Sequence, residues 1–311
     1  MKKINRTHVI YQMSAENQPS AFIEPGETIT VETYDCYQGQ LLPEGSTFKN
    51  FDRRFGNPAT GPICINGAKP GDLLKITIQK IALGPVGILD IGPNSGAMKE
   101  YFPEPVIRRI PVEDGTLTYC GTNGRDVKIP VKPMIGVIGT APSKAAGAVS
   151  TMTPMDHGGN MDCTRICEGS ILYLPVFTEG GLLALGDFHA IMGDGEVGNC
   201  GVEIEGEAEL TIDLIHGTDN TSPVISFPLI ENSEQWITVA YGETLDLASE
   251  KAVKQMFQFL TGHQNLSPAD AGMLIDMLGD LIVCQIVNPM KTARMEVPKW
   301  AIKQLQPTSA H

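Results

Sequence analysis

A chain of 311 residues can bury a substantial core and can hold one large domain or a few smaller ones. Its 42% hydrophobic and 19% charged residues are typical of a globular protein and exclude a disordered or fibrous one. The net charge of -13, without a dense run of Lys or Arg, disfavours a nucleic-acid partner, and no apolar run approaches the roughly 18 residues of a membrane-spanning helix.

Short segments of alternating apolar and polar residues predict β-strands along most of the chain. The 33 Gly and 22 Pro indicate many turns between these strands. Residues 84–110 are rich in Gly and Pro and are predicted to be irregular. The predicted strands cover residues 29–35, 63–65, 73–81, 117–119, 127–131, 136–139, 171–176, 182–188 and 202–215.

The longest alternating segment, residues 202–215, has one acidic face and one apolar face. We interpret the acidic face as the solvent-exposed side of an antiparallel sheet. A calcium-binding patch is the alternative, since calcium prefers oxygen ligands. The acidic face consists of Glu203, Glu205, Glu207 and Glu209, and the apolar face of Val202, Ile204, Ala208, Leu210, Ile212 and Leu214.

Helical periodicity replaces alternation in the last part of the chain. It predicts a helix over residues 247–260, which Gly262 can end. A second helix is predicted to begin at the capping box Ser267-Pro268-Ala269-Asp270. Residues 281–287 are predicted to form a buried strand, which Pro289 follows.

This change of pattern suggests two regions. Residues 1–230 are predicted to be mainly β and to contain the active site, and residues 231–311 to form an α+β region. Within the first region, residues 90–165 are a candidate for a small β insertion.

The seven cysteines are odd in number and lack the spacing of a disulfide framework, so we expect reduced thiols. The first residues lack the apolar segment of a secretory signal. Both observations predict a soluble, cytoplasmic protein.

Candidate chemistry is concentrated in residues 154–205. Asp187 and His189 lie two apart at the end of a predicted strand, so their side chains share a face and could hold a divalent cation. Asp194 and Glu196 have the same spacing on a nearby loop, and a buried carboxylate of this kind is the usual general base in metal-assisted hydrolysis. The structural alternative stays open, because Asp and Glu among glycines are often turn formers.

Several further residues are weaker candidates. Asp35 ends a predicted strand and is either a turn residue or part of a site. Cys163 and Cys167 follow His157 closely and could bind zinc or supply a nucleophile, although a second cysteine pair is missing. His216, just after the longest strand, is interpreted as a surface residue.

The sequence resembles the acetamidase/formamidase family in a series of short motifs that follow the family's order and span most of the chain. They are Glu32-Thr33-Tyr34-Asp35, Asn57-Pro58-Ala59-Thr60-Gly61-Pro62, Gly67-Ala68-Lys69-Pro70-Gly71-Asp72, His157-Gly158-Gly159-Asn160-Met161-Asp162, Leu174-Pro175-Val176, Gly186-Asp187-Phe188-His189-Ala190 and Gly193-Asp194-Gly195-Glu196.

The resemblance implies hydrolysis of formamide, acetamide or a similar short amide to ammonia and a carboxylate. It also implies a homo-oligomer and a divalent metal, with zinc expected first and calcium second. For the fold, we expect a mainly β protein with an antiparallel β-sandwich or barrel core and a smaller C-terminal α+β portion.

The expected site follows from the motifs and the resemblance together. Asp187 and His189 would bind the metal, with Asp35 or His157 completing the ligand set. Glu196 would act as general base, with Asp162 or Asp194 as alternatives. Asp162 could instead orient a metal-binding histidine. Donors to the oxyanion would be Asn160 and the backbone N–H groups of Gly158 and Gly159.

Two competing functions remain open at this point. One is a non-enzymatic β-sandwich that uses a cation to hold a small ligand, supported by the acidic face of residues 203–209. The other is a cysteine-dependent amidase that uses Cys163 or Cys36 as the nucleophile.

Overall fold

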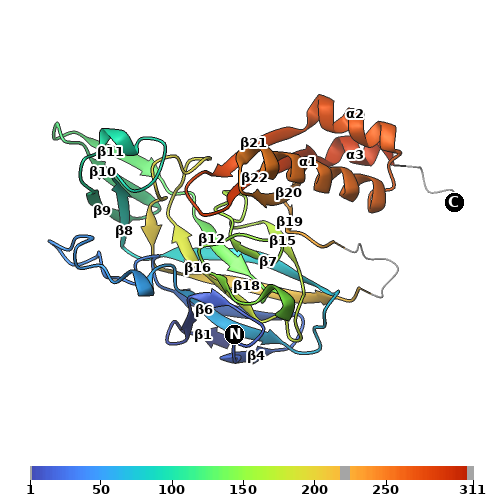
Figure 1. The fold of residues 1–311 in the computed structure, drawn as a ribbon, viewed down its shortest axis with the longest axis horizontal. Helices are drawn as coiled ribbons and strands as arrows, with labels where there is room; N and C mark the ends of the chain where they lie inside the picture. Colours follow the sequence, from blue (N-terminus) through green and yellow to red (C-terminus); the bar gives the residue numbers. More distant parts are fainter. Residues whose placement is uncertain (1, 218–224, 307–311) are drawn as a thin grey trace.

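The computed structural model describes residues 2–217 and 225–306 of the chain, and two large β-sheets with three α-helices make up most of it (Figure 1). The nine-stranded sheet has the order β1 (Lys2–Ile4), β5 (Glu27–Thr33), β18 (Gly206–Ile215), β7 (Leu73–Leu83), β15 (Ile171–Pro175), β19 (Leu229–Glu231), β20 (Gln235–Gly242), β22 (Lys291–Pro298) and β21 (Asp280–Gln285). Its pairings are antiparallel except β1 with β5.

The second sheet has eleven strands and carries the candidate residues near its centre. Its main path is β11 (Asp126–Pro130), β10 (Thr116–Cys120), β9 (Val106–Glu113), β8 (Val86–Ile91), β17 (Glu203–Ile204), β16 (Leu183–His189), β12 (Met134–Gly139) and β14 (Gly158–Asn160). β6 (Ala59–Ile65) also pairs with β16 and joins β2 (Val9–Ile10) and β4 (Ala21–Ile23) to the sheet, while β3 (Gln12–Met13) and β13 (Val149–Ser150) form a separate pair.

The main core lies between the two sheets, because each contributes an apolar face to it. Ile76 and Leu210 from the nine-stranded sheet share one buried cluster with Leu185, Phe188 and Ile204 from the eleven-stranded sheet. In β7 the buried Leu74, Ile76 and Ile78 alternate with more exposed polar residues, as expected for a strand with one buried face. The predicted antiparallel sandwich-like core is confirmed.

The helices α1 (Leu245–Gly262), α2 (Pro268–Leu278) and α3 (Lys299–Leu305) pack around β20 and β22 in a second core (Figure 1). Ala252, Met256 and Phe259 form the buried stripe of α1. The Ser267 hydroxyl accepts the backbone N–H of Asp270 and caps α2. Both predicted helices are thus confirmed, and no helix within the described ranges is long and apolar enough to cross a membrane.

Two local predictions are wrong. Residues 84–110 are irregular only in part, since β8 and β9 pair there while the connection of residues 92–105 contains no strand. Gly87 lies inside β8 because a Cβ at that position would be 2.5 Å from Val202, so this glycine allows close packing rather than a turn. The strand predicted over residues 281–287 ends at Gln285 and is not buried throughout, because β21 is an edge strand and Leu281 is 48% exposed.

The division of the chain at residue 230, with the insertion at 90–165, stays a prediction. The nine-stranded sheet itself crosses the proposed boundary, since β19 and β20 continue the row begun by strands from the first region. This continuity places β21 and β22 close to the loops that carry the candidate residues.

Candidate functional site

A cavity of about 350 Å³ opens beside the end of β16. Its walls come from segments far apart in the sequence, which the two sheets bring together. The lining residues are Cys36, Tyr37, Phe48, Phe51, Arg53, Gly56, Asn57, Asp90, Gly92, Asn94, Ser95, Pro105, Met152, Asn160, Asp187, Glu196, Asn199, Cys200, Glu203, Val287 and Asn288.

Four carboxylates and one imidazole gather at the buried side of this cavity, and we call them the acid–histidine cluster. None of the five residues is more than 7% exposed. The cluster consists of Asp162, Asp187, His189, Glu196 and Glu203.

The end of β16 supplies the centre of the cluster. The Nε2 atom of His189 lies 3.6 Å from Asp187 Oδ1 and 4.0 Å from Asp162 Oδ1. Gly201 makes room for the imidazole, since a Cβ there would lie 2.6 Å from His189 Nδ1. The structure therefore brings together Asp187 and His189, as the strand spacing suggests, and adds Asp162.

Glu203 stands directly opposite His189 in the pairing of β16 with β17, and its Oε1 lies 2.9 Å from His189 Nε2. The prediction that Glu203 faces solvent is wrong, because it is only 2% exposed. The alternation breaks at Glu205, where the chain passes from the eleven-stranded sheet to the nine-stranded sheet. Gly206 permits this crossing, since a Cβ there would lie 2.5 Å from the carbonyl oxygen of Ala82.

Three asparagines hold the two aspartates. With its NH2 group turned toward the carboxylates, Asn160 donates to Asp187 Oδ2 at 3.0 Å and to Asp162 Oδ1 at 3.1 Å. Its oxygen then accepts from Asn57 and Asn288, each at 3.1 Å. The amide of Asn160 is therefore committed to the carboxylates and orients them, which leaves it poorly placed as an oxyanion donor.

Several residues at the cavity have left-handed backbone conformations although they are not glycine. The φ angles are +52° at Asn57, +46° at Asp162, +58° at Asp187 and +44° at Glu196. Such conformations are uncommon and cost free energy, and they concentrate at functional sites because the surrounding structure must hold them. The rest of the fold therefore imposes the positions of these side chains.

The close packing of carboxylates changes their protonation. Burial, followed by the charge of Asp187, raises the pKa of Asp162 from 3.8 to about 7. Burial also raises the pKa of Glu196 and that of Glu203 well above the usual value, with neighbouring carboxylates adding to the effect. Burial alone would lower the pKa of His189, but the charges of Glu203 and Asp187 outweigh it and raise that pKa.

The donor atoms fit a divalent cation. Ligand atoms of Asp162, His189 and Glu196 all lie within 4.8 Å of one another. Within the described ranges, neither ring nitrogen of His189 makes a well-aligned hydrogen bond, and Glu196 Oε2 has no partner. Buried polar atoms without partners are costly, and a mixed imidazole and carboxylate set suits zinc. The residues present thus satisfy the chemistry that the expected metal requires.

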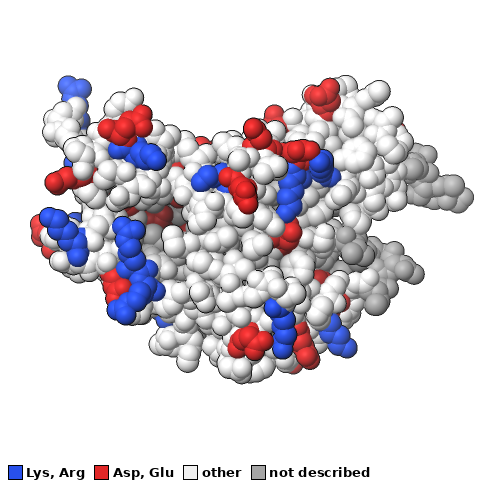
Figure 2. Space-filling model, in the orientation of Figure 1, with Lys and Arg blue, Asp and Glu red and all other residues white. Residues whose placement is uncertain are grey.

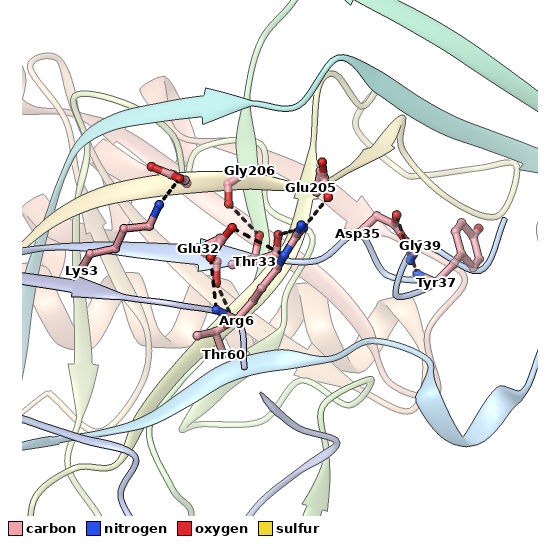
Figure 3. A network of polar contacts seen from close by, with 11 residues as sticks. Lys3, Arg6, Glu32, Thr33, Asp35, Tyr37, Gly39, Thr60, Glu205 and Gly206 are labelled. Atoms are coloured by element: carbon pink, nitrogen blue, oxygen red, sulfur yellow. Dashed lines mark hydrogen bonds and ion pairs between the residues drawn. The ribbon is translucent and has the colours of Figure 1, made fainter. Parts of the chain in front are cut away.

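Asp35 lies outside this arrangement. Figure 3 shows its carboxylate turned toward the backbone of the following turn, where it accepts the N–H groups of Tyr37 at 2.7 Å and Gly39 at 3.1 Å. Its contacts are those of the turn-forming alternative. His157 is also buried but does not join the cluster of close ligand atoms, and burial lowers its pKa to about 4.

Gly158 and Gly159 allow β14 to pack closely against its neighbours. Gly158 and Gly159 belong to β14, and neither lines the cavity. A Cβ at Gly158 would lie 2.3 Å from the carbonyl oxygen of Ile138, and the N–H of Gly158 donates to Met155. Their role as oxyanion donors stays a prediction.

Two loops of the cluster are tied to β22. Asp194 accepts from Nη1 and Nη2 of Arg294 at 2.6 and 2.9 Å, so this carboxylate is not free to act as a base. Arg165, on the loop that follows Asp162, donates to Glu296 of the same strand at 2.7 Å. β22 therefore anchors both the Glu196 loop and the Asp162 loop.

The cysteine candidates separate in the structure, and all seven cysteines carry free thiols. Cys36 lines the cavity, whereas Cys163 is fully buried in the main core and Cys167 does not line the cavity. His216 is half exposed and lies 3.3 Å from Asp72, in agreement with the surface interpretation.

Charged side chains of both signs lie on the surface of the molecule. Figure 2 shows acidic and basic side chains scattered over the visible face rather than gathered in one broad patch.

The chain is similar to known proteins both in sequence and in structure. Residues 5–146 and 144–266 match the model of the Acetamidase/Formamidase family. The chain is 27% identical to a formamidase of Methylophilus methylotrophus over 63% of this chain and 61% of that protein. It is 27% identical to an acetamidase of Mycolicibacterium smegmatis over 68% of this chain and 66% of that protein. The chain thus spans slightly less than two thirds of these relatives.

Solved structures match over nearly the whole chain. The crystal structure of an acetamidase from Bacillus halodurans has a TM-score of 0.91 and 39% identity, covering 98% of this chain and all of that one (100%). A predicted acetamidase/formamidase from Thermoanaerobacter tengcongensis has a TM-score of 0.91 and 38% identity, covering 98% of this chain and 97% of that one.

Gly136 of β12 offers a test of the packing in the cluster. A Cβ at this position would lie 2.6 Å from Asp162 Oδ1 and 2.8 Å from Asp187 Oδ2. We expect Gly136→Ala to displace the two carboxylates, lower zinc affinity at least tenfold and cost about 1–3 kcal/mol of stability. Gly272→Ala in α2 is the control, since nothing lies within 4 Å of its Cβ. Calorimetric zinc titration and thermal melts would measure both variants, and unchanged zinc affinity in Gly136→Ala would contradict the expected crowding.

The metal-free protein should lose stability as the pH rises. The pKa of Asp162 is about 7 in the folded protein and 3.8 in the unfolded chain. The folded state therefore binds this proton more tightly. Its contribution to the free energy of unfolding is complete below pH 3.8 and is lost as the pH rises from 3.8 to about 7. Since one pKa unit corresponds to about 1.4 kcal/mol, the loss should be several kcal/mol. Thermal melts in chelator at pH 5 and pH 8 would show it, and Asp162→Asn should reduce the slope. A melting temperature that is constant or rises over this range would refute the expectation.

Proposed function

This chain belongs to the acetamidase/formamidase family, and we propose that it hydrolyses short amides to ammonia and a carboxylate with the help of a divalent metal. The observation that carries the proposal is the acid–histidine cluster, in which Asp187, Glu196 and Glu203 line a cavity large enough for a small amide and the buried His189 lies directly behind them with unpartnered ring nitrogens. The amidases among its relatives support the same reaction.

We assign proton transfer to Glu196. It lines the cavity, and its Oε2 has no hydrogen-bond partner in the part of the chain that the structure describes. Because burial raises its pKa, it can take a proton from the attacking water and still give that proton up to the departing nitrogen. The nitrogen then leaves as ammonia, the amide carbon gains the water oxygen, and one water is consumed.

We propose Asp162, Asp187 and His189 as ligands of the metal, with zinc first and calcium second. Asp187 Oδ1, which lies 3.6 Å from His189 Nε2, takes the place of Glu196 in this set, because Glu196 is assigned to proton transfer. Imidazole nitrogen together with carboxylate oxygen favours zinc, since calcium prefers oxygen ligands alone. A bound zinc ion would supply Lewis-acid polarisation of the amide carbonyl. Asn160 holds both aspartates in place for this purpose.

The shape of the cavity bears on the acyl group. One wall consists of Tyr37, Phe48 and Phe51, whose rings pack edge to face with centroids 5.6–5.9 Å apart. The cavity of about 350 Å³ lies in the usual size range of small-molecule sites. Acetamide has only four non-hydrogen atoms, so we propose that short amides with acyl groups larger than acetyl also fit.

A cysteine nucleophile is less well supported. Burial, together with the charges of Glu203 and Asp187, raises the pKa of the Cys36 thiol well above its usual value. The reactive thiolate would therefore be scarce at neutral pH. The non-enzymatic alternative relied on the acidic face of residues 203–209, but Glu203 turns into the cavity instead.

Residence in the cytoplasm and assembly into a homo-oligomer stay predictions. The free thiols of all seven cysteines agree with a reducing compartment.

Ammonia release from a series of amides tests the function directly. We expect turnover of formamide, acetamide and propionamide, no turnover of urea, and loss of activity in chelator that zinc restores. Butyramide should be accepted as well, because the aromatic wall leaves room for the longer chain. Full activity in metal-free protein would exclude the proposed metal dependence, and no ammonia from any amide would exclude the hydrolysis.

Glu196→Gln tests the proton-transfer role. The amide keeps the shape of the side chain but cannot accept a proton, so kcat should fall about 10²–10⁴-fold while zinc content is retained. Glu207→Gln, on the half-exposed side of β18, is the matched control and should keep wild-type kcat. A Glu196→Gln variant with wild-type kcat would show that another group moves the proton.

A further inference from the structure

A second set of possible metal ligands lies beside the first. Ligand atoms of Cys36, Asp187 and Glu203 are all within 4.8 Å of one another, and all three residues line the cavity. Asp187 also faces His189, since its Oδ1 lies 3.6 Å from Nε2 of that residue. One aspartate therefore stands between two groups of donors.

Glu203 provides independent evidence for a ligand at this place. Its side chain is only 2% exposed, and its Oε2 lacks a hydrogen-bond partner among the residues that the structure describes. A buried carboxylate oxygen without a partner is costly unless something positive or protic fills the space. Because Glu203 lines the cavity together with Cys36, a cation in this space would satisfy both.

The charge of the ionised cluster also exceeds what one ion can balance. When bound metal has displaced the protons of the four buried carboxylates, a single divalent cation leaves about two negative charges uncompensated. The buried guanidinium of Arg294 does not relieve this excess, because it is paired with Asp194 and Glu296. A second divalent cation would bring the cluster close to neutrality.

We propose that the cavity holds two divalent cations, the second bound by Cys36, Asp187 and Glu203, with Asp187 shared between the two ions. The thiol makes zinc the favoured ion of the second site, because sulfur ligands select against magnesium and calcium. Binding requires the thiolate, so the second ion displaces the proton of Cys36. The inference rests on the proposed function only for the position of the first ion.

Counting ions provides the test, and it needs no turnover. Protein stripped by chelator is reloaded with zinc or with cadmium, freed of excess metal, and analysed for metal per chain. Cadmium additionally reports a thiolate ligand through its sulfur-to-metal charge-transfer absorption in the ultraviolet. We expect two ions per chain and this absorption in the wild-type protein.

Cys36→Ser should bind one ion and lose the charge-transfer absorption. Cys200→Ser is the matched control, because Cys200 also lines the cavity but contacts Asp90 at 3.3 Å instead of the ligand set. It should keep both ions and the absorption. One ion per wild-type chain, absence of the thiolate absorption, or two ions in Cys36→Ser would each overturn the proposal.

The wild-type measurement stands even if Cys36→Ser fails to fold, since ion count and absorption are read on the unaltered chain. The two proposals also fail separately. Two ions with the thiolate absorption but no amide turnover would overturn only the proposed function. Metal-dependent turnover with a single ion and no thiolate absorption would overturn only the second site.

Discussion

The constraint on which this structure depends is the burial of four carboxylates around one imidazole. Like charges this close repel strongly in a medium of low polarity, so the fold must hold them together against their own electrostatics. It does so with amide donors from Asn160, with space left by Gly136 and Gly201, and with left-handed backbone at Asp162, Asp187 and Glu196. The paired strands around the cluster hold this strained backbone and the carboxylates in place.

Much of the fold could be predicted because its strands each have one buried face. Alternation located β5, β7 and β15, and periodicity with the Ser267 cap located α1 and α2. The errors occurred where a local pattern does not report the tertiary neighbour. A glycine such as Gly87 favours a turn in the sequence, but in the structure it lies in a strand because Val202 packs against it. The exposure of Leu281 depends on the position of β21 at a sheet edge.

The candidate site was predictable only in part. Asp187 and His189 follow from strand spacing, and the Glu196 loop from its glycine-rich motif. Glu203 could not be found this way, because it has the same two-residue spacing as Glu205, Glu207 and Glu209. Only the tertiary structure shows that the chain changes sheets after Glu203 and buries this one glutamate. Asn57 and Asn288 meet Asn160 only through long-range packing. Asn57 lies in one of the family motifs, but its contact with Asn160 cannot be read from that motif, and no local signal marks Asn288.

The contacts of β22 with the loops of Glu196 and Asp162 give the C-terminal region a structural role in the site, although it lies far from these loops in the sequence. Arg294 and Glu296 each hold a loop that carries an acid of the cluster, and the backbone of Gly195 pairs with that of Cys284 and Ile286. A segment fastened at both backbone and side chain opens only when its support opens. Glu196 therefore sits on a fixed platform rather than on a lid. Access to Glu196 is therefore set by the other walls of the cavity and not by movement of the loop that carries this residue.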